Sequence, residues 1–246
     1  MVIPPPHEIP PMTSEPPASA SRMTSLPRAL PPEPFAPEGG SGPLGQVQYW
    51  LAVIFVVGWT GVVCGGLGVQ FGSWDYPCPL CMVQRNFMIL AALGGAYIVR
   101  KGMSGRISRR DYMTGWGLCI VGCFGGGFAA WRQTMLHILP GDPGYGGAVL
   151  GLHLYVWALV LFVAAVTTIG VVLTFANETA AEIVPTRGVS ARLGRAALWF
   201  CGIVIVINLV SVFALAGLHW YLPDNPSCYQ LFHDLGVIDG ECPILE

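Results

Sequence analysis

The chain has 246 residues and a net charge of −2, and 53% of its residues are hydrophobic while only 11% are charged. This composition, with a mean hydropathy of +0.58, argues against a soluble domain and predicts an all-α polytopic membrane protein. No basic patch or phosphate-binding loop is visible, so no nucleic-acid partner is expected.

The first 47 residues are rich in proline and hold 13 of the 21 prolines of the chain. Such a segment buries too little apolar surface to offset its chain entropy, so residues 1–47 are predicted to be a disordered tail. They lack the charged, apolar and cleavage-site regions of a signal peptide. A ligand for proline-binding domains is the alternative, and an idle tail is favoured over it.

Five apolar segments follow, each about as long as the roughly 20 helical residues that cross a bilayer core of about 30 Å. The sequence therefore predicts a five-span transmembrane domain over residues 48–221 and a C-terminal tail over 222–246. The spans are expected near residues 48–70, 82–100, 113–137, 152–176 and 197–221.

Lysine and arginine are distributed unevenly between the connecting segments. Segments 100–112 and 177–196 are basic, whereas 71–79, 138–151 and 222–246 contain neither residue. By the positive-inside rule the N-terminus is cytoplasmic and the C-terminus lies outside. In a bacterial cell this describes a multi-pass inner-membrane protein whose outer side is the periplasm, an oxidising compartment in which disulfides persist.

A CxxC pair, Cys78-Pro79-Leu80-Cys81, stands on that outer side at the mouth of the second apolar segment, and Arg85 follows one turn further in. The CxxC spacing brings two sulfurs close enough to cycle between dithiol and disulfide. A helix N-terminus and a nearby guanidinium both favour the thiolate, which is the reactive form. The pattern predicts electron exchange with a molecule dissolved in the bilayer.

Arg85 is predicted to lie within the apolar core of the membrane. It precedes Arg100 by 15 residues, or about 22 Å of helix at about 1.5 Å per residue. If Arg100 marks the inner interface, Arg85 lies in the outer third of the core, where a cation is costly and is a functional-site candidate. Snorkelling to the outer headgroups is the alternative, but the shared helix face with Cys81 favours function.

The run Pro77–Cys81 with Gln84 and Arg85 resembles the signature of the DsbB family of membrane thiol–quinone oxidoreductases. This resemblance implies a DsbB-like four-helix bundle, here with one extra transmembrane helix. It covers roughly residues 50–175, because further matches mark the end of the family's third span and the start of its fourth: Thr134-Met135-Leu136, Pro140, Gly151-Leu152 and Trp157.

The resemblance implies an enzyme that reoxidises a periplasmic thioredoxin-like oxidase of the DsbA type and passes the electrons to the membrane quinone pool, ubiquinone or menaquinone. By this analogy Cys81 faces the quinone and Cys78 exchanges with a second cysteine pair. Arg85 holds the quinone headgroup and stabilises negative charge as it forms.

The sequence departs from the family in the position of that second pair. The segment 138–151, where the pair usually lies, has no cysteine, whereas the tail beyond the extra span holds Cys228 and Cys242. We therefore expect these two to form the shuttle pair; a structural disulfide that closes a small tail loop is the alternative.

Two further residues are predicted to bind the quinone beside Arg85. Gln133 occupies the position of a histidine often found near the outer end of the family's third span, and His153 begins the fourth apolar segment. For His153 and the other outer histidines, an ordinary interfacial position is also open.

The remaining cysteines fall within apolar spans and are predicted to pack rather than to react. The four cysteines within the apolar spans of this chain are Cys64, Cys119, Cys123 and Cys201.

The outer histidines leave a haem- or metal-handling protein as an alternative, although no pair has the spacing of metal ligands on one helix. A vitamin K epoxide reductase-like enzyme is another alternative, but that family places its CxxC at the mouth of its last core helix.

Overall fold

The computed structural model describes residues 43–104, 107–174, 188–219, 221–222 and 226–237. The chain divides into two units, Met1–Pro37 and Glu38–Glu246. The first unit, and with it most of the predicted N-terminal tail, lies outside the described residues. All the described elements belong to the second unit.

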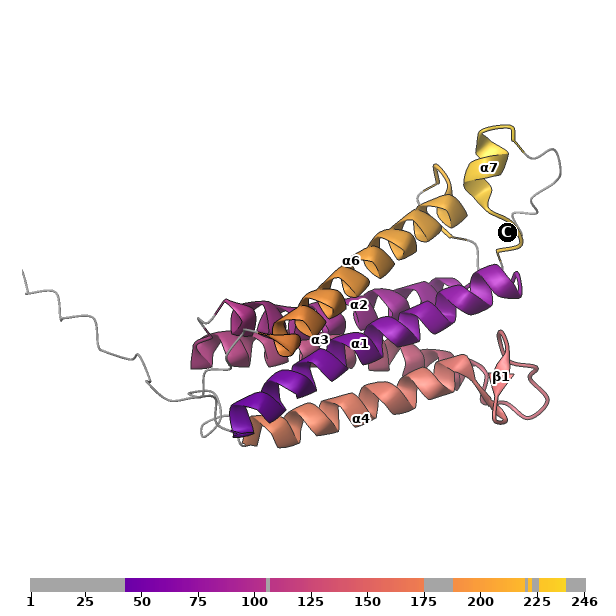
Figure 1. Ribbon diagram of the computed structural model, residues 1–246. Helices are drawn as coiled ribbons and strands as arrows, with labels where there is room; N and C mark the ends of the chain where they lie inside the picture. Colours follow the sequence, from indigo (N-terminus) through magenta and orange to yellow (C-terminus); the bar gives the residue numbers. More distant parts are fainter. Residues whose placement is uncertain (1–42, 105–106, 175–187, 220, 223–225, 238–246) are drawn as a thin grey trace, which may run out of the picture. The chain divides into compact units, whose positions relative to one another are not determined.

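Five helices of the described part are long and apolar enough to cross a membrane. The prediction of an all-α polytopic protein with five spans is therefore confirmed (Figure 1). The helices are α1 (Pro43–Gly72), α2 (Pro79–Met103), α3 (Arg109–Leu136), α4 (Leu154–Thr174) and α6 (Val189–Ala216).

The fifth span differs most from its expected bounds. Helix α6 begins at Val189 rather than near residue 197 and ends at Ala216 rather than at 221. Its start is earlier because hydropathy locates the apolar centre of a span, whereas the helical backbone continues into polar surroundings. Its end is earlier because Gly217, with a φ of 64°, caps the helix. Arg192 and Arg195, expected in a connecting segment, consequently lie in the first turns of α6.

Short elements occupy the connections at one end of the bundle. Strands β1 (Ala148–Val149) and β2 (Leu152–His153) pair antiparallel between α3 and α4. Leu150 and Gly151 form the turn with φ of 52° and 80°, as tight two-residue hairpins require. The single turn of helix α7 (Gln230–Asp234) lies in the predicted C-terminal tail.

Helix α2 begins at the CxxC motif itself. Cys78 is its N-cap, with extended backbone, and its sulfur accepts a hydrogen bond from the Cys81 backbone N–H, while Pro79 occupies the first turn. Proline is favoured there because the first amides of a helix have no intrahelical acceptor. The sequence that supplies the two cysteines therefore also starts the helix that holds them.

Close packing between α2 and α3 is made possible by glycine. A β-carbon on Gly122 would lie 2.7 Å from the backbone nitrogen of Ala91, and one on Gly94 would lie equally close to Cys119. Small residues let helices approach at such short range in a membrane. Cys119 is buried in this contact and its sulfur lies 3.3 Å from the Ala91 carbonyl oxygen, as expected of a packing cysteine.

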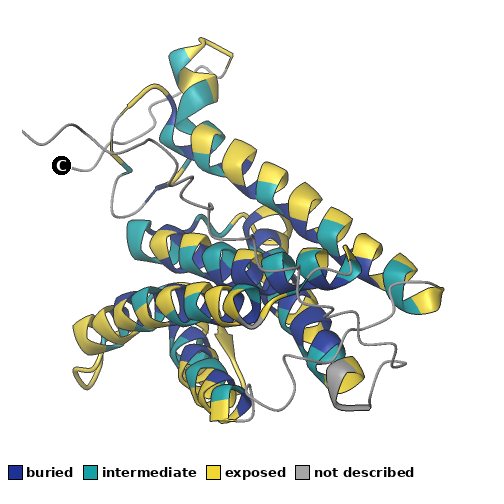
Figure 2. Cartoon of the chain, turned by 90° about the vertical axis from the view of Figure 1, so that its left-hand side faces the viewer, coloured by how far each residue is buried: buried dark blue, intermediate teal, exposed yellow. Residues whose placement is uncertain are grey.

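The other helices are arranged around this pair. Helix α1 packs on α2, α4 packs on α3, and α6 packs on α1 and α2. Trp59 of α1 stacks on Phe162 of α4 at 4.8 Å between ring centroids, which fixes the centre of the bundle. Figure 2 shows buried residues on the helix faces that meet and exposed residues on the outward faces.

Three segments of the chain lie close together at one end of the bundle. Tyr145 lies in the α3–α4 connection and Tyr76 in the α1–α2 connection. The Tyr145 hydroxyl donates to the Tyr76 carbonyl oxygen at 2.6 Å. Tyr229, beside α7, packs its ring 5.2 Å from that of Tyr76. The α1–α2 connection, the α3–α4 connection and the C-terminal segment therefore meet around the start of α2.

Candidate redox site at the start of helix α2

The two sulfurs of the CxxC motif lie side by side. Cys78 Sγ and Cys81 Sγ are 2.8 Å apart, and the Cys81 backbone N–H donates to Cys78 Sγ at 3.2 Å. Cys78 is buried, whereas Cys81 is partly exposed. A disulfide bond of about 2.05 Å needs only a small movement from this arrangement, so the pair is placed to cycle between dithiol and disulfide.

Gln133 of α3 contacts both sulfurs. Its side-chain nitrogen lies 3.4 Å from Cys78 Sγ and 3.5 Å from Cys81 Sγ. Its oxygen accepts from the Gln84 side chain at 2.7 Å, which fixes the orientation of the amide. The predicted quinone-binding residue Gln133 therefore lies against the cysteine pair, where its N–H groups can stabilise negative charge on sulfur.

The two sulfurs have different surroundings. The hydrogen bond with Cys81 and, next, burial raise the pKa of the Cys78 thiol far above its ordinary value. Cys81 Sγ lies beside the Gln133 amide nitrogen and on the same cavity wall as Arg85, and both groups favour negative charge on this sulfur.

Arg85 is buried one turn below Cys81 and is held by two neutral acceptors on α1. Its Nη1 donates to Gln70 Oε1 and its Nη2 donates to the Gly66 carbonyl oxygen, both at 2.7 Å. The side chain is only 8% exposed, so it does not snorkel to a surface within this structure. These neutral oxygens take the place of water around the guanidinium, and neither carries a negative charge that would offset that of the arginine.

Gln70 extends this contact to two further parts of the chain. Its side-chain nitrogen donates to Ser211 Oγ of α6 at 2.8 Å and to the Tyr229 hydroxyl at 3.3 Å. Gln70 and Ser211 are both buried. The fifth helix and the C-terminal segment are thereby joined to the arginine of the second helix.

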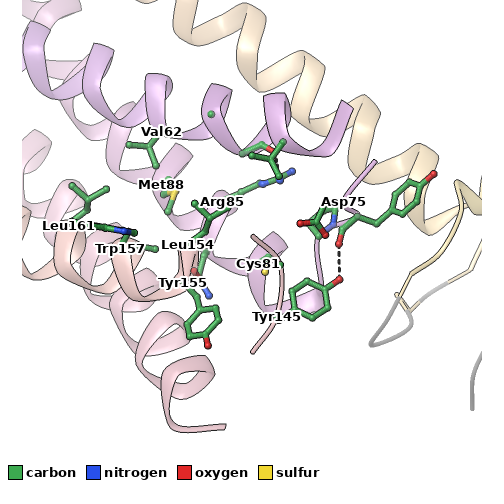
Figure 3. Close-up of a pocket in the computed structure, with 18 residues that line it drawn as sticks. Val62, Asp75, Cys81, Arg85, Met88, Tyr145, Leu154, Tyr155, Trp157 and Leu161 are labelled. Carbon is green, nitrogen blue, oxygen red and sulfur yellow. Dashed lines mark hydrogen bonds between the residues drawn. The ribbon is translucent and has the colours of Figure 1, made fainter. Parts of the chain in front are cut away.

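A cavity of about 350 Å³ opens beside these groups. Cys81 and Arg85 form part of its wall, and α4 contributes apolar and aromatic side chains, as Figure 3 shows. A volume of this order suits a small aromatic ligand or headgroup. The α4 residues are Leu154, Tyr155, Trp157, Ala158 and Leu161.

Comparison with known proteins identifies a family for the part of the chain that carries this site. Residues 48–146 match the family described as "Disulfide bond formation protein DsbB". Over these 99 of its 246 residues the chain is similar to the DsbB family. No curated protein and no solved structure matches the chain.

The DsbB match spans α1, α2, α3 and most of the α3–α4 connection. It includes Cys78, Cys81, Arg85 and Gln133, and ends before α4, short of the residue 175 expected from the resemblance. Family and fold together support a membrane thiol–disulfide oxidoreductase of the disulfide-forming class.

His153, the other predicted quinone-binding residue, lies next to the cavity but is not part of its wall. Its Nδ1 is 3.2 Å from the Gly146 carbonyl oxygen, and its ring stacks on Tyr155 at 5.4 Å between centroids. Tyr155 and Gly146 both line the cavity. A role of His153 in quinone binding stays a prediction.

The cysteines outside the DsbB signature divide into two groups. Cys228 is disulfide-bonded, and Cys242 lies outside the described residues. The four cysteines of the apolar spans are free, in keeping with their predicted packing role. Among the described residues, no group of three or more His, Cys, Asp or Glu side chains could hold a metal ion.

Gln70 and Tyr229 are the site residues that sequence reasoning missed. An amide within an otherwise apolar span was a usable signal for Gln70, since polar residues inside a membrane are costly and usually have a partner. Tyr229, in a short polar tail, offered no comparable signal. Its place beside the site follows only from the packing of α7 at the end of α6.

Proposed function

We propose that this protein is a thiol:quinone oxidoreductase that oxidises a dithiol protein outside the membrane. The observation that carries the proposal is that Cys81 and Arg85 share the wall of one cavity at the start of α2. A redox sulfur and a buried cation on the same wall suit an electron acceptor that develops negative charge on oxygen as it is reduced.

The residues present fit a quinone headgroup. The apolar and aromatic side chains of α4 suit its ring, and the Arg85 guanidinium suits a ring oxygen. When bound, a quinone supplies the sink for two electrons and two protons that returns Cys78 and Cys81 to the disulfide. Ubiquinone and menaquinone share this chemistry, and either fits the proposal.

The protein substrate is proposed to be a DsbA-like thioredoxin-like oxidase in its reduced form. Its thiolate attacks a disulfide formed by Cys228 and Cys242, and the mixed disulfide resolves to oxidised partner and two tail thiols. The tail thiols then reduce the Cys78–Cys81 disulfide by the same exchange. Each cycle moves two electrons and two protons from the partner to the quinone.

The position of the tail supports this shuttle role. Cys228 is disulfide-bonded, and Tyr229, its neighbour in sequence, packs against Tyr76 at 5.2 Å between ring centroids. Tyr76 in turn precedes Cys78 by two residues. Thiol exchange then requires the tail to move toward Cys78, and an extended chain spans about 3.5 Å per residue.

We infer the orientation in the membrane from the basic residues. Arg100, Lys101 and Arg110 lie at the end of the bundle remote from the start of α2. We place that end in the cytoplasm and the CxxC end in the periplasm of a bacterial inner membrane. The shuttle disulfide then lies in the compartment in which disulfides persist.

The test is reduction of a short-chain quinone by purified protein, followed by absorbance, with a reduced thioredoxin-like oxidase or dithiothreitol as donor. We expect turnover with both donors and none in Cys81→Ser, because serine forms neither thiolate nor disulfide. Cys119→Ser, a substitution of a buried packing cysteine, is the matched control and keeps its activity. Normal turnover in Cys81→Ser would refute the proposal.

A further inference from the structure

The orientation of the Gln70 side chain is determined by the arginine beside it. Gln70 is fully buried, and its amide has one acceptor oxygen and two donor hydrogens. Arginine only donates, so Gln70 Oε1 has to face Arg85 Nη1, as it does at 2.7 Å. The amide nitrogen is then turned toward Ser211 of α6 and Tyr229 of the tail.

Tyr229 fixes the C-terminal segment at the same place. Its hydroxyl accepts from Gln70, and its ring packs against Phe71 at 6.5 Å and Tyr76 at 5.2 Å between centroids. It directly follows Cys228. Any movement of the disulfide-bearing segment away from the bundle therefore removes an acceptor from Gln70.

A second anchor holds the other side of α7. Asp234 accepts from the Leu218 backbone N–H at 3.0 Å and lies 3.3 Å from the His219 ring nitrogen. This anchor connects α7 only to the end of α6. The connection to the arginine therefore runs through Tyr229 and Gln70.

We propose that Gln70 is a positioning residue through which docking of the segment 226–237 holds Arg85 in place for the quinone. With the segment docked, both Gln70 donors are satisfied and its oxygen is fixed toward Arg85. With the segment displaced, as thiol exchange at Cys228 requires, the amide loses one partner and Arg85 is held less firmly. This inference rests on the proposed function, because it assigns Arg85 to the quinone.

The consequence is an ordering of the two half-reactions. The quinone is held best while the tail is docked and worst while the tail exchanges with the protein partner. If the tail served only as a shuttle, changes in its docking would not alter the affinity for the quinone in an assay in which the electrons bypass the tail. Dithiothreitol provides such an assay, since it can reduce Cys78–Cys81 directly.

The experiment measures two properties of the full-length protein in detergent. The first is the apparent KM for a short-chain quinone with dithiothreitol as donor, in Tyr229→Phe and Gln70→Leu. The second is hydrogen–deuterium exchange of the peptide 226–237, in Gln70→Leu and Ser211→Ala. His233→Ala, an exposed substitution on the same short helix, is the control for both.

We expect the KM to rise about threefold in Tyr229→Phe, which keeps the ring and removes only the hydroxyl, and about tenfold in Gln70→Leu. The kcat should change by less than about twofold, because the cysteines are untouched. Combining the two substitutions should add little to the effect of Gln70→Leu, since both act on one chain of hydrogen bonds. Exchange of the peptide should accelerate in Gln70→Leu and less in Ser211→Ala.

An unchanged KM in Tyr229→Phe, or unchanged exchange in Gln70→Leu, would overturn the inference while leaving the proposed function intact. A wild-type protein that reduces no quinone with either donor would instead refute the proposed function, and with it the role of Gln70 toward the quinone. The exchange measurement reports on tail docking in either case, because it needs no turnover.

Discussion

A single methyl group at Gly66 should displace Arg85 without changing its charge. A β-carbon at this position would lie 3.0 Å from Arg85 Nε, 3.2 Å from Nη2 and 3.3 Å from Cζ. The Gly66 carbonyl oxygen is also one of the two acceptors of the guanidinium. Gly66→Ala therefore pushes the guanidinium away from the helix that holds it.

The size of the effect follows from these distances. Ordinary contacts of a β-carbon begin near 3.4 Å, so the guanidinium has to move by about 0.4 Å. Its two hydrogen bonds of 2.7 Å each contribute about 1.5–3 kcal/mol, as bonds to a charged group do. Weakening one of them by roughly half costs about 1 kcal/mol, which corresponds to about a fivefold rise in the KM for the quinone.

The assay is the quinone titration with dithiothreitol as donor. Gly68→Ala is the matched control, because it lies on the same helix and its β-carbon would meet nothing within 4 Å. Both substitutions replace glycine by a better helix former, so any general effect on α1 is common to the two. An unchanged KM in Gly66→Ala, or an equal rise in Gly68→Ala, would refute the reasoning.

Three further outcomes test other parts of the site. Arg85→Lys keeps the charge but loses the planar pair of donors, so the KM for the quinone should rise roughly tenfold in the same titration with little change in thermal stability. Gln133→Leu removes the donors to both sulfurs, and alkylation of the reduced pair by iodoacetamide at fixed pH should slow severalfold; an unchanged rate would contradict this role. Replacing Cys228 and Cys242 by serine should stop oxidation of the protein partner and spare that of dithiothreitol, whereas normal oxidation of the partner would make the tail disulfide purely structural.

The sequence was sufficient to predict the elements that local chemistry determines. Apolar runs of span length predicted five membrane helices, and the CxxC motif predicted a cysteine pair at the start of the second of them. Both predictions depend on residues within one segment. The bounds of α6 were less predictable, because helical backbone extends past the apolar centre that hydropathy detects.

The contacts that complete the site could not be predicted from local sequence patterns. Gln70 and Ser211 are 141 residues apart, and Gln70 and Tyr229 are 159 residues apart. No spacing rule relates residues at such separations, since only the packing of α6 and α7 on α1 brings them together. Quinone binding by Gln133 stays a prediction, and the contacts that the structure adds for it are with the two sulfurs and Gln84.

The hydrogen-bond partners of Arg85 stabilise a cation within a membrane span without neutralising its charge. A carboxylate would satisfy the guanidinium and also cancel its charge, so little field would remain for a ligand. Gln70 and Gly66 instead offer neutral oxygens at 2.7 Å, which replace water without supplying a negative charge. Under the proposed function, Arg85 therefore keeps its positive charge for an oxygen that becomes negative as electrons arrive in the cavity, whose wall also includes Asp75.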